Sequence, residues 1–170
     1  MIRVVLRAAA LLLVVAATAY ALHRWAWLPL RCVHAASTGA AALDQATQQS
    51  DESKTLAVAT RVRAQLQGCE CVSPPDVRIP FTTGGTAAAS GDPRAAIPEL
   101  QRALAIDRRP EIYLALGFAQ LDAMDRASAI ENIVRAVAFD PARLGQIPYP
   151  DVRQETKKRI WERYGREWLR

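Results

Sequence analysis

Residues Gly91–Asp107 read GDPRAAIPELQRALAID, and residues Met124–Asp140, thirty-three positions further on, read MDRASAIENIVRAVAFD. In this register the small and aliphatic residues of the two segments coincide: Ala96, Ile97, Leu100, Ala103 and Leu104 in the first, and Ala129, Ile130, Ile133, Ala136 and Val137 in the second. Apolar residues three and four positions apart fall on one face of an α-helix. The two segments therefore predict two copies of one amphipathic helix within a repeated unit.

The second copy belongs to a longer unit, Pro110–Pro141, with a characteristic set of residues. They are Tyr113, Leu116, Gly117, Ala129, Ile133, Ala136 and Pro141. On these residues the unit resembles a tetratricopeptide repeat (TPR), a family that usually has an aromatic residue at the position of Gln120. The resemblance implies two antiparallel helices that cross closely at Gly117, with Pro141 ending the second because proline has no amide hydrogen to donate.

The preceding unit, Val77–Arg109, shows the repeat clearly in its second helix and weakly in its first. Its first half contains Thr83-Gly84-Gly85, a run of poor helix formers. A glycine-rich phosphate loop is the alternative interpretation, but the sequence lacks the GxxxxGK pattern followed by Ser or Thr. Gly84 aligns with Gly117, so we expect a small residue at a helix crossing.

Helical patterns also occur on both sides of these two units. Residues 35–49 and 52–67 predict a degenerate helical hairpin, and residues 151–170 predict a helix that covers the last hydrophobic surface of the stack. The sequence thus predicts an all-α chain with a signal peptide or transmembrane anchor at 1–24, a juxtamembrane segment at 25–34, a degenerate hairpin at 35–76, two TPR-like repeats at 77–141, and a loop with a capping helix at 142–170.

The N-terminal leader is an uncharged apolar stretch, Ala8–Leu22, between Arg7 and Arg24. Such a stretch behind basic residues, with small residues in an A-x-A pattern ending at Ala21, is typical of a cleavable signal peptide. Counted from Val4, the stretch has nineteen residues, close to the roughly 20 that a transmembrane helix needs.

Trp25 and Trp27 favour the retained anchor, because tryptophan is enriched at membrane interfaces. We therefore expect residues 4–30 to contact the membrane and the bulk of the chain to lie on the extracytoplasmic, periplasmic side. Cleavage after Ala21, which would release a soluble exported protein, is the alternative.

The chain has three cysteines, Cys32, Cys69 and Cys71. Outside the cytoplasm, where thiols can oxidise, we expect Cys32 to pair with either Cys69 or Cys71. The alternative is a zinc site formed by Cys32, His34 and the other two cysteines. Structural zinc sites usually have two or more residues between paired ligands, so we expect no metal.

Signals for catalysis and for nucleic-acid binding are weak. The two histidines, His23 and His34, lie beside the leader, and no G-x-S-x-G, HExxH or dinucleotide fingerprint occurs. The formal net charge of +5 is spread among acids, whereas nucleic-acid binding needs a concentrated basic face. We therefore expect no enzymatic activity, no cofactor and no nucleic-acid partner.

The TPR resemblance implies a groove, lined by the first helix of each pair, that binds a protein. The matching positions are Phe81, Glu111, Leu114, Phe118, Leu121 and Asp122. The alternative is that Leu114, Phe118 and Leu121 pack against the chain's own degenerate hairpin or its C-terminal helix. We expect a membrane-anchored TPR adaptor or accessory subunit that binds another envelope or membrane-complex protein, or else a cleaved, soluble TPR chaperone or assembly factor.

Overall fold

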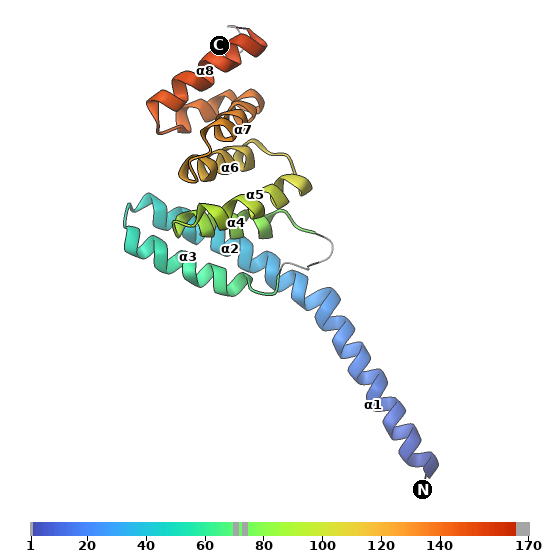
Figure 1. The fold of residues 1–170 in the computed structure, drawn as a ribbon. Helices are drawn as coiled ribbons and strands as arrows, with labels where there is room; N and C mark the ends of the chain where they lie inside the picture. Colours follow the sequence, from blue (N-terminus) through green and yellow to red (C-terminus); the bar gives the residue numbers. More distant parts are fainter. Residues whose placement is uncertain (1, 70–71, 73–74, 166–170) are drawn as a thin grey trace.

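The first element of the fold is a long helical rod (Figure 1). In the computed structural model, which describes residues 2–69, 72 and 75–165, α1 (Ile2–Leu22), a π-helical turn η1 (His23–Trp27) and α2 (Leu28–Gln48) follow one another without a break. Leu22 and Leu28, at the two junctions, keep right-handed helical backbone angles. The predicted juxtamembrane segment, 25–34, is therefore helical and part of the rod.

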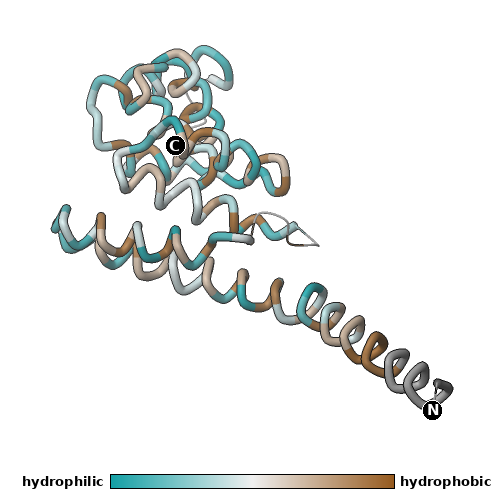
Figure 2. Tube along the Cα trace, turned by 60° about the horizontal axis from the view of Figure 1, so that its bottom comes forward, coloured by the Kyte–Doolittle hydropathy of each residue, from teal (hydrophilic) through white to brown (hydrophobic). Residues whose placement is uncertain are grey.

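The apolar half of the rod projects away from the rest of the protein (Figure 2). Its aliphatic side chains are exposed; Leu12 and Leu13, for example, are 71% and 72% exposed. The helix is long and apolar enough to cross a membrane, and none of its most apolar window is buried against the protein. The described residues are helical without a strand. An all-α fold with an N-terminal helix suited to a membrane anchor or a signal sequence is thus confirmed.

Three helical hairpins follow one another as a stack (Figure 1). They pair α2 with α3 (Glu52–Leu66), α4 (Arg78–Ala89) with α5 (Pro93–Ile106), and α6 (Pro110–Asp122) with α7 (Arg126–Phe139). Each hairpin packs against the next, α3 against α4 and α5 against α6.

The stack ends in a short C-terminal segment that packs on α7. It consists of a 3-10 helix, η2 (Pro141–Gln146), and the last helix, α8 (Pro150–Tyr164). Residues 166–170 of the predicted capping helix lie outside the described residues.

All three hairpins turn in the same way. Each turn places a residue with positive φ directly before an aspartate: Ser50-Asp51, Gly91-Asp92 and Met124-Asp125. The carboxylate of each aspartate accepts a hydrogen bond from the backbone N–H three residues later and so caps the second helix. The degenerate hairpin therefore shares its turn with the two clear repeats.

A glycine in the first helix of each hairpin lets the second helix approach closely. A Cβ at Gly39, Gly84 or Gly117 would meet, respectively, Val62 Cγ1 at 2.5 Å, Leu100 Cγ at 2.7 Å and Ile133 Cγ1 at 2.6 Å. Ordinary carbon contacts are about 3.5–4.0 Å, so a larger residue cannot be accommodated without a shift. Gly84 is thus a small residue at a helix crossing, as its alignment with Gly117 predicted.

Helix α4 forms although its sequence has weak helical propensity. It buries Ile79, Thr82, Thr86 and Ala87 against its neighbours, each at most 5% exposed. The Thr82 hydroxyl also donates a hydrogen bond to the Ala36 carbonyl of α2 at 3.2 Å. Tertiary packing therefore outweighs local propensity here.

Gln120, the departure from the TPR pattern, lies at the interface of α6 and α7. Its Oε1 accepts a hydrogen bond from Asn132 Nδ2 at 2.8 Å, and both residues are buried. A polar pair thus occupies the position between the helices where the family has an aromatic ring.

Candidate partner-binding surface

The first helices of the hairpins, α2, α4 and α6, contact one another in sequence along one flank of the stack. Gly85 of α4 is directed toward α2, because a Cβ there would lie 3.8 Å from Leu43 Cδ2. Phe81 and Ala88 share this side of α4 by helical spacing, and Phe118 of α6 is the repeat equivalent of Gly85. We define the first-helix face as Leu43, Phe81, Gly85, Ala88, Phe118, Leu121 and Asp122.

Leu114 does not belong to this open face. It is 5% exposed and lies in the core cluster that contains Ile130, Ile133 and Ile147. Leu144 of η2 packs against the same cluster, so the chain after α7 folds back over this part of α6. This corrects the expectation that Leu114 lines a groove, since a partner cannot reach it.

Phe118 and Leu121 are partly buried against the same cluster, which also contains Val152 and Ile160 of α8. Helix α8 therefore contributes to the cluster on which both side chains pack. Leu121 still lines an open hollow of about 200 Å³ at the end of α6. The other residues of this hollow are Asp122, Arg126, Tyr149, Asp151 and Val152.

The two predicted acidic groove residues differ in their surroundings. Glu111 faces the chain's own η2: its carboxylate lies 3.7 Å from the Arg143 guanidinium, which also pairs with Asp140 at 3.0 Å. Asp122 is exposed and makes no ion pair within the described part of the chain. Asp122 is thus the acid of this set that is open to a partner.

Phe81 is partly buried against the cluster formed by Leu100, Leu116 and Ala119. The small residues Gly85 and Ala88 lie on the same side of α4, one and two helical turns further along. Beyond Phe81, the α4 part of the first-helix face is therefore apolar and has only short side chains.

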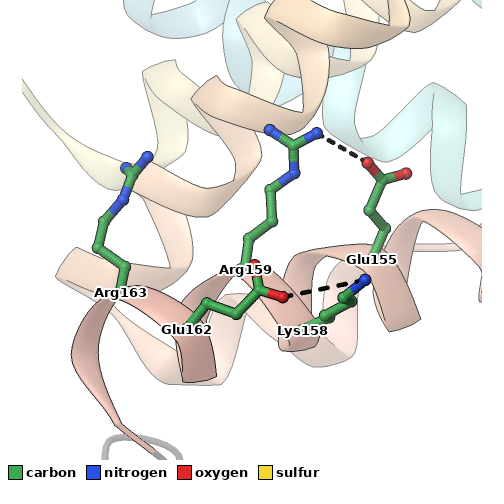
Figure 3. Close-up of a pocket in the computed structure, with 5 residues that line it drawn as sticks. All are labelled: Glu155, Lys158, Arg159, Glu162 and Arg163. Carbon is green, nitrogen blue, oxygen red and sulfur yellow. Dashed lines mark hydrogen bonds and ion pairs between the residues drawn. The ribbon is translucent and has the colours of Figure 1, made fainter.

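Charged side chains line a shallow trough of about 610 Å³ along α8 at the C-terminal end of the stack (Figure 3). Glu155 pairs with Arg159 at 3.0 Å, on the side of α8 that faces the neighbouring helix. Lys158 pairs with Glu162 at 3.9 Å, and both are exposed. Exposed polar residues are what a terminal element needs to close a helical stack.

Ion pairs hold α8 to α7. Arg163 donates two hydrogen bonds to the Glu131 carboxylate, at 3.1 and 3.2 Å, and these bonds lower the pKa of Glu131. Arg126 contacts Asp151 at 2.8 Å and Glu155 at 3.3 Å. The hydrogen bond from Arg126 likewise lowers the pKa of Asp151.

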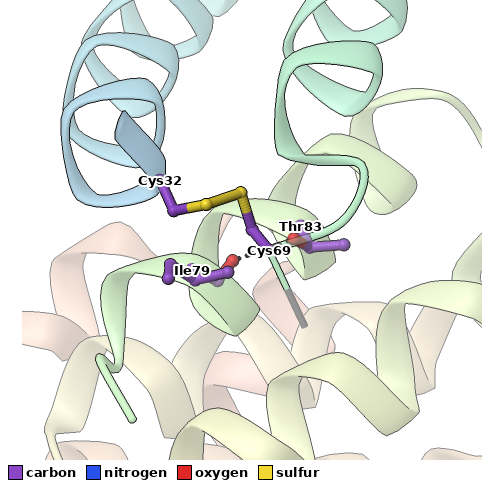
Figure 4. Close-up of a disulfide and its surroundings, with 4 residues drawn as sticks. All are labelled: Cys32, Cys69, Ile79 and Thr83. Carbon is purple, nitrogen blue, oxygen red and sulfur yellow. Dashed lines mark hydrogen bonds between the residues drawn. A yellow bond between two sulfur atoms is a disulfide. The ribbon is translucent and has the colours of Figure 1, made fainter. Parts of the chain in front are cut away.

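A disulfide joins the rod to the end of the first hairpin (Figure 4). Of the two partners left open for Cys32, the structure joins it to Cys69, with a Cα–Cα distance of 5.7 Å, whereas Cys71 lies outside the described residues. The bond packs against Ile79 of α4. Because both sulfurs are in the disulfide, Cys32 and Cys69 are not available as thiolate ligands for a metal.

Comparison of the chain with protein-family models, with curated proteins and with solved structures finds no match. The function is therefore inferred from the residues and the geometry of this chain alone.

A hollow of about 450 Å³ lies where the rod enters the stack, among residues to which none of the sequence motifs assigns a role. This juxtamembrane hollow is lined by Trp27, Leu30, Arg31, His34, Ala35, Thr38 and Gln65. The spacing of Trp27, Arg31, His34 and Thr38 along one helical face is a signal that the sequence does contain. The contribution of Gln65, from α3, depends on the fold.

Proposed function

We propose that the protein is a non-enzymatic, membrane-anchored adaptor of the TPR type, which binds another membrane-complex or envelope protein on the extracytoplasmic side. The observation that carries this proposal is the unbroken rod. One continuous helix bears the exposed apolar segment at one end and forms half of the first hairpin at the other. A membrane anchor built in this way holds the hairpin stack at the membrane surface, where a membrane-bound partner is found.

The buried disulfide supports the same interpretation. It fastens the base of α2 to the end of α3, so the rod cannot separate from the hairpin by fraying at this point. Disulfides persist in oxidising compartments, which is in keeping with a stack outside the cytoplasm.

The first-helix face suits an apolar segment of a partner. The small residues Gly85 and Ala88 lie on the same side of α4 as Phe81, and Phe118 holds the position of α6 that corresponds to Gly85. At the rim, Asp122 favours a basic residue on the partner. The ligand is therefore an apolar helix or extended strand with a positive charge near one end.

Site-specific photo-crosslinking in native membranes tests this proposal. A crosslinking residue at Ala88 or Asp122 should capture the same partner protein, whereas one at Arg61, exposed on α3, should not. The variant Asp122→Arg, at an exposed position, should weaken co-purification of that partner while the protein still melts cooperatively. Identical products from Ala88 and Arg61, or none from either face position, would refute the proposal.

A soluble, exported protein is the second candidate, because the A-x-A pattern ending at Ala21 favours cleavage. The intact mass of the protein isolated from its native host separates the two. A mass that lacks the first twenty-one residues excludes the anchor.

A further inference from the structure

The juxtamembrane hollow combines apolar and cationic side chains on one strip of the rod. Trp27 and Leu30 are 59% and 66% exposed, and Arg31 and His34, one and two turns above Trp27, are exposed as well. Gln65, near the end of α3, closes the other side. The lower part of the hollow is thus apolar and its upper part carries nitrogen donors.

The position of the hollow relative to the apolar rod sets its depth in a membrane. Tryptophan is enriched at the membrane–water interface, so with α1 in the bilayer Trp25 and Trp27 mark that level. Arg31 follows Trp27 by four residues, which in a helix is about 6 Å along the axis. The polar headgroup layer is about 5–8 Å thick on each side of the hydrocarbon. Arg31 therefore lies at the height of the lipid phosphates, and His34, about 10 Å along the axis from Trp27, lies just outside the headgroup layer.

The charges around the hollow are of one sign. The first forty-three residues contain no aspartate or glutamate, and Arg31 forms no ion pair within the described residues. On α3, Arg61 lies one turn before Gln65 on the same face and is likewise exposed. An anion that enters the hollow therefore meets unneutralised cations.

Among the described residues, Asp76, an acid that reaches α2 through its partner, is already paired. Asp76 binds Arg78 through both carboxylate oxygens, at 2.9 and 2.7 Å, and this pairing lowers the pKa of Asp76. Arg78 in turn reaches Ser37, the neighbour of Thr38, at 3.4 Å. Asp76 thus does not neutralise Arg31.

From this arrangement we infer that the juxtamembrane hollow binds the headgroup of an anionic phospholipid in the leaflet that faces the hairpin stack. The Arg31 guanidinium can hold two phosphate oxygens at once. His34, Thr38 and Gln65 offer further donors, and Trp27 and Leu30 cover the glycerol and the start of the acyl chains. A free phosphate ion would leave these apolar residues without a partner, so the lipid is the better occupant. The inference rests on the membrane anchoring proposed above.

The test uses the full chain in bilayer nanodiscs of phosphatidylcholine mixed with phosphatidylglycerol. Native mass spectrometry then measures which lipids the released protein retains. We expect the wild type to retain phosphatidylglycerol in preference to phosphatidylcholine. Each cation near an anionic membrane surface contributes about 1 kcal/mol, so Arg31→Gln should reduce this preference about fivefold. His34→Gln in addition should reduce it further.

Arg108→Gln is the matched control, because it removes the same charge from an exposed residue between α5 and α6, away from the hollow. It should retain phosphatidylglycerol as the wild type does. Equal retention by Arg31→Gln and Arg108→Gln would overturn the inference, provided that circular dichroism shows both variants folded; if Arg31→Gln is not folded, Arg31→Lys takes its place.

Three further outcomes have separate meanings. Displacement of the lipid by inorganic phosphate would overturn the inference in favour of a free-anion site. Loss of the wild-type protein from the discs would refute the anchoring, and the inference with it. Retention in the discs without any lipid preference refutes the inference alone.

Discussion

Replacing Gly117 by alanine tests the packing of the hairpin crossing. The new Cβ would lie 2.6 Å from Ile133 Cγ1 and 3.1 Å from the Ala129 carbonyl oxygen. The first distance is about 1 Å below ordinary carbon contact. Ile133 is fully buried and the carbonyl belongs to the backbone of α7, so neither can withdraw easily.

The expected magnitude follows from two opposing effects. Overpacking of a core costs about 1–3 kcal/mol, and alanine in place of glycine in a helix stabilises by about 1 kcal/mol. Because a backbone atom limits relaxation, we take the upper half of the first range. Gly117→Ala should therefore lower the free energy of unfolding by about 1–2 kcal/mol, which for a chain of this size lowers Tm by about 3–8 °C.

The assay is thermal unfolding of the full chain in mild detergent, followed by far-ultraviolet circular dichroism. Gly85→Ala is the matched control, because its Cβ meets only Leu43 Cδ2, at 3.8 Å. This variant should gain about 0.5–1 kcal/mol from helix propensity alone. In an Ile133→Ala background, where the obstructing atom is missing, Gly117→Ala should no longer destabilise. Equal Tm values for Gly117→Ala and Gly85→Ala would refute the close crossing.

Three other perturbations have defined outcomes. Thr156→Val should raise the stability by about 1 kcal/mol, because the buried Thr156 hydroxyl has no hydrogen-bond partner, whereas Thr86→Val, which loses a 2.8 Å bond to the Thr83 carbonyl, should not. The pKa of Glu131 is lowered by its hydrogen bonds with Arg163. The contact therefore stabilises the fold fully at pH values above the ordinary glutamate pKa, and this stabilisation is lost as the pH falls through the lowered pKa of Glu131. Glu131→Gln should flatten a plot of Tm against pH in that acidic range. Reduction of the Cys32–Cys69 disulfide, which spans 37 residues, should cost about 2–4 kcal/mol, measured as a lower Tm with reductant; an unchanged Tm would contradict the bond.

The two clear repeats could be located from the sequence because their structural residues recur at one spacing. Gly84 and Gly117 form the crossings, and Asp92 and Asp125 cap the second helices. Because a local geometry requires each of these residues, the same residue type occurs again thirty-three positions later.

The first hairpin has the same crossing and cap but lacks that spacing. Gly39 precedes the capping Asp51 by twelve residues, whereas Gly84 precedes Asp92 by eight. The longer helix shifts the pattern out of register, so the sequence indicated only a degenerate pair. Its equivalence becomes visible once Val62 is seen against Gly39.

The role of Leu114 could not be predicted from the sequence. An apolar residue at that position faces an open groove if the chain ends nearby and a core if later residues cover it. Here Leu144 and Ile147 fold back onto the same cluster, a contact made across some thirty residues of sequence. The juxtamembrane hollow was missed for a similar reason, because Gln65 comes from another helix.

The π-helical turn η1 affects how the hairpin stack is rotated about the axis of the rod. It ends at Trp27, two residues before Pro29, which has no amide hydrogen to continue the α-helical pattern, and it holds one more residue than an α turn. Each residue of an α-helix advances the chain by about 100° around the axis. Deletion of one residue from His23–Trp27 would therefore restore an α turn and leave the first-helix face at nearly the same angle to α1. Deletion of one residue from α1 itself would instead rotate the membrane-facing part of the rod by about 100° relative to the stack, so this turn is the place where the rod tolerates a change in length.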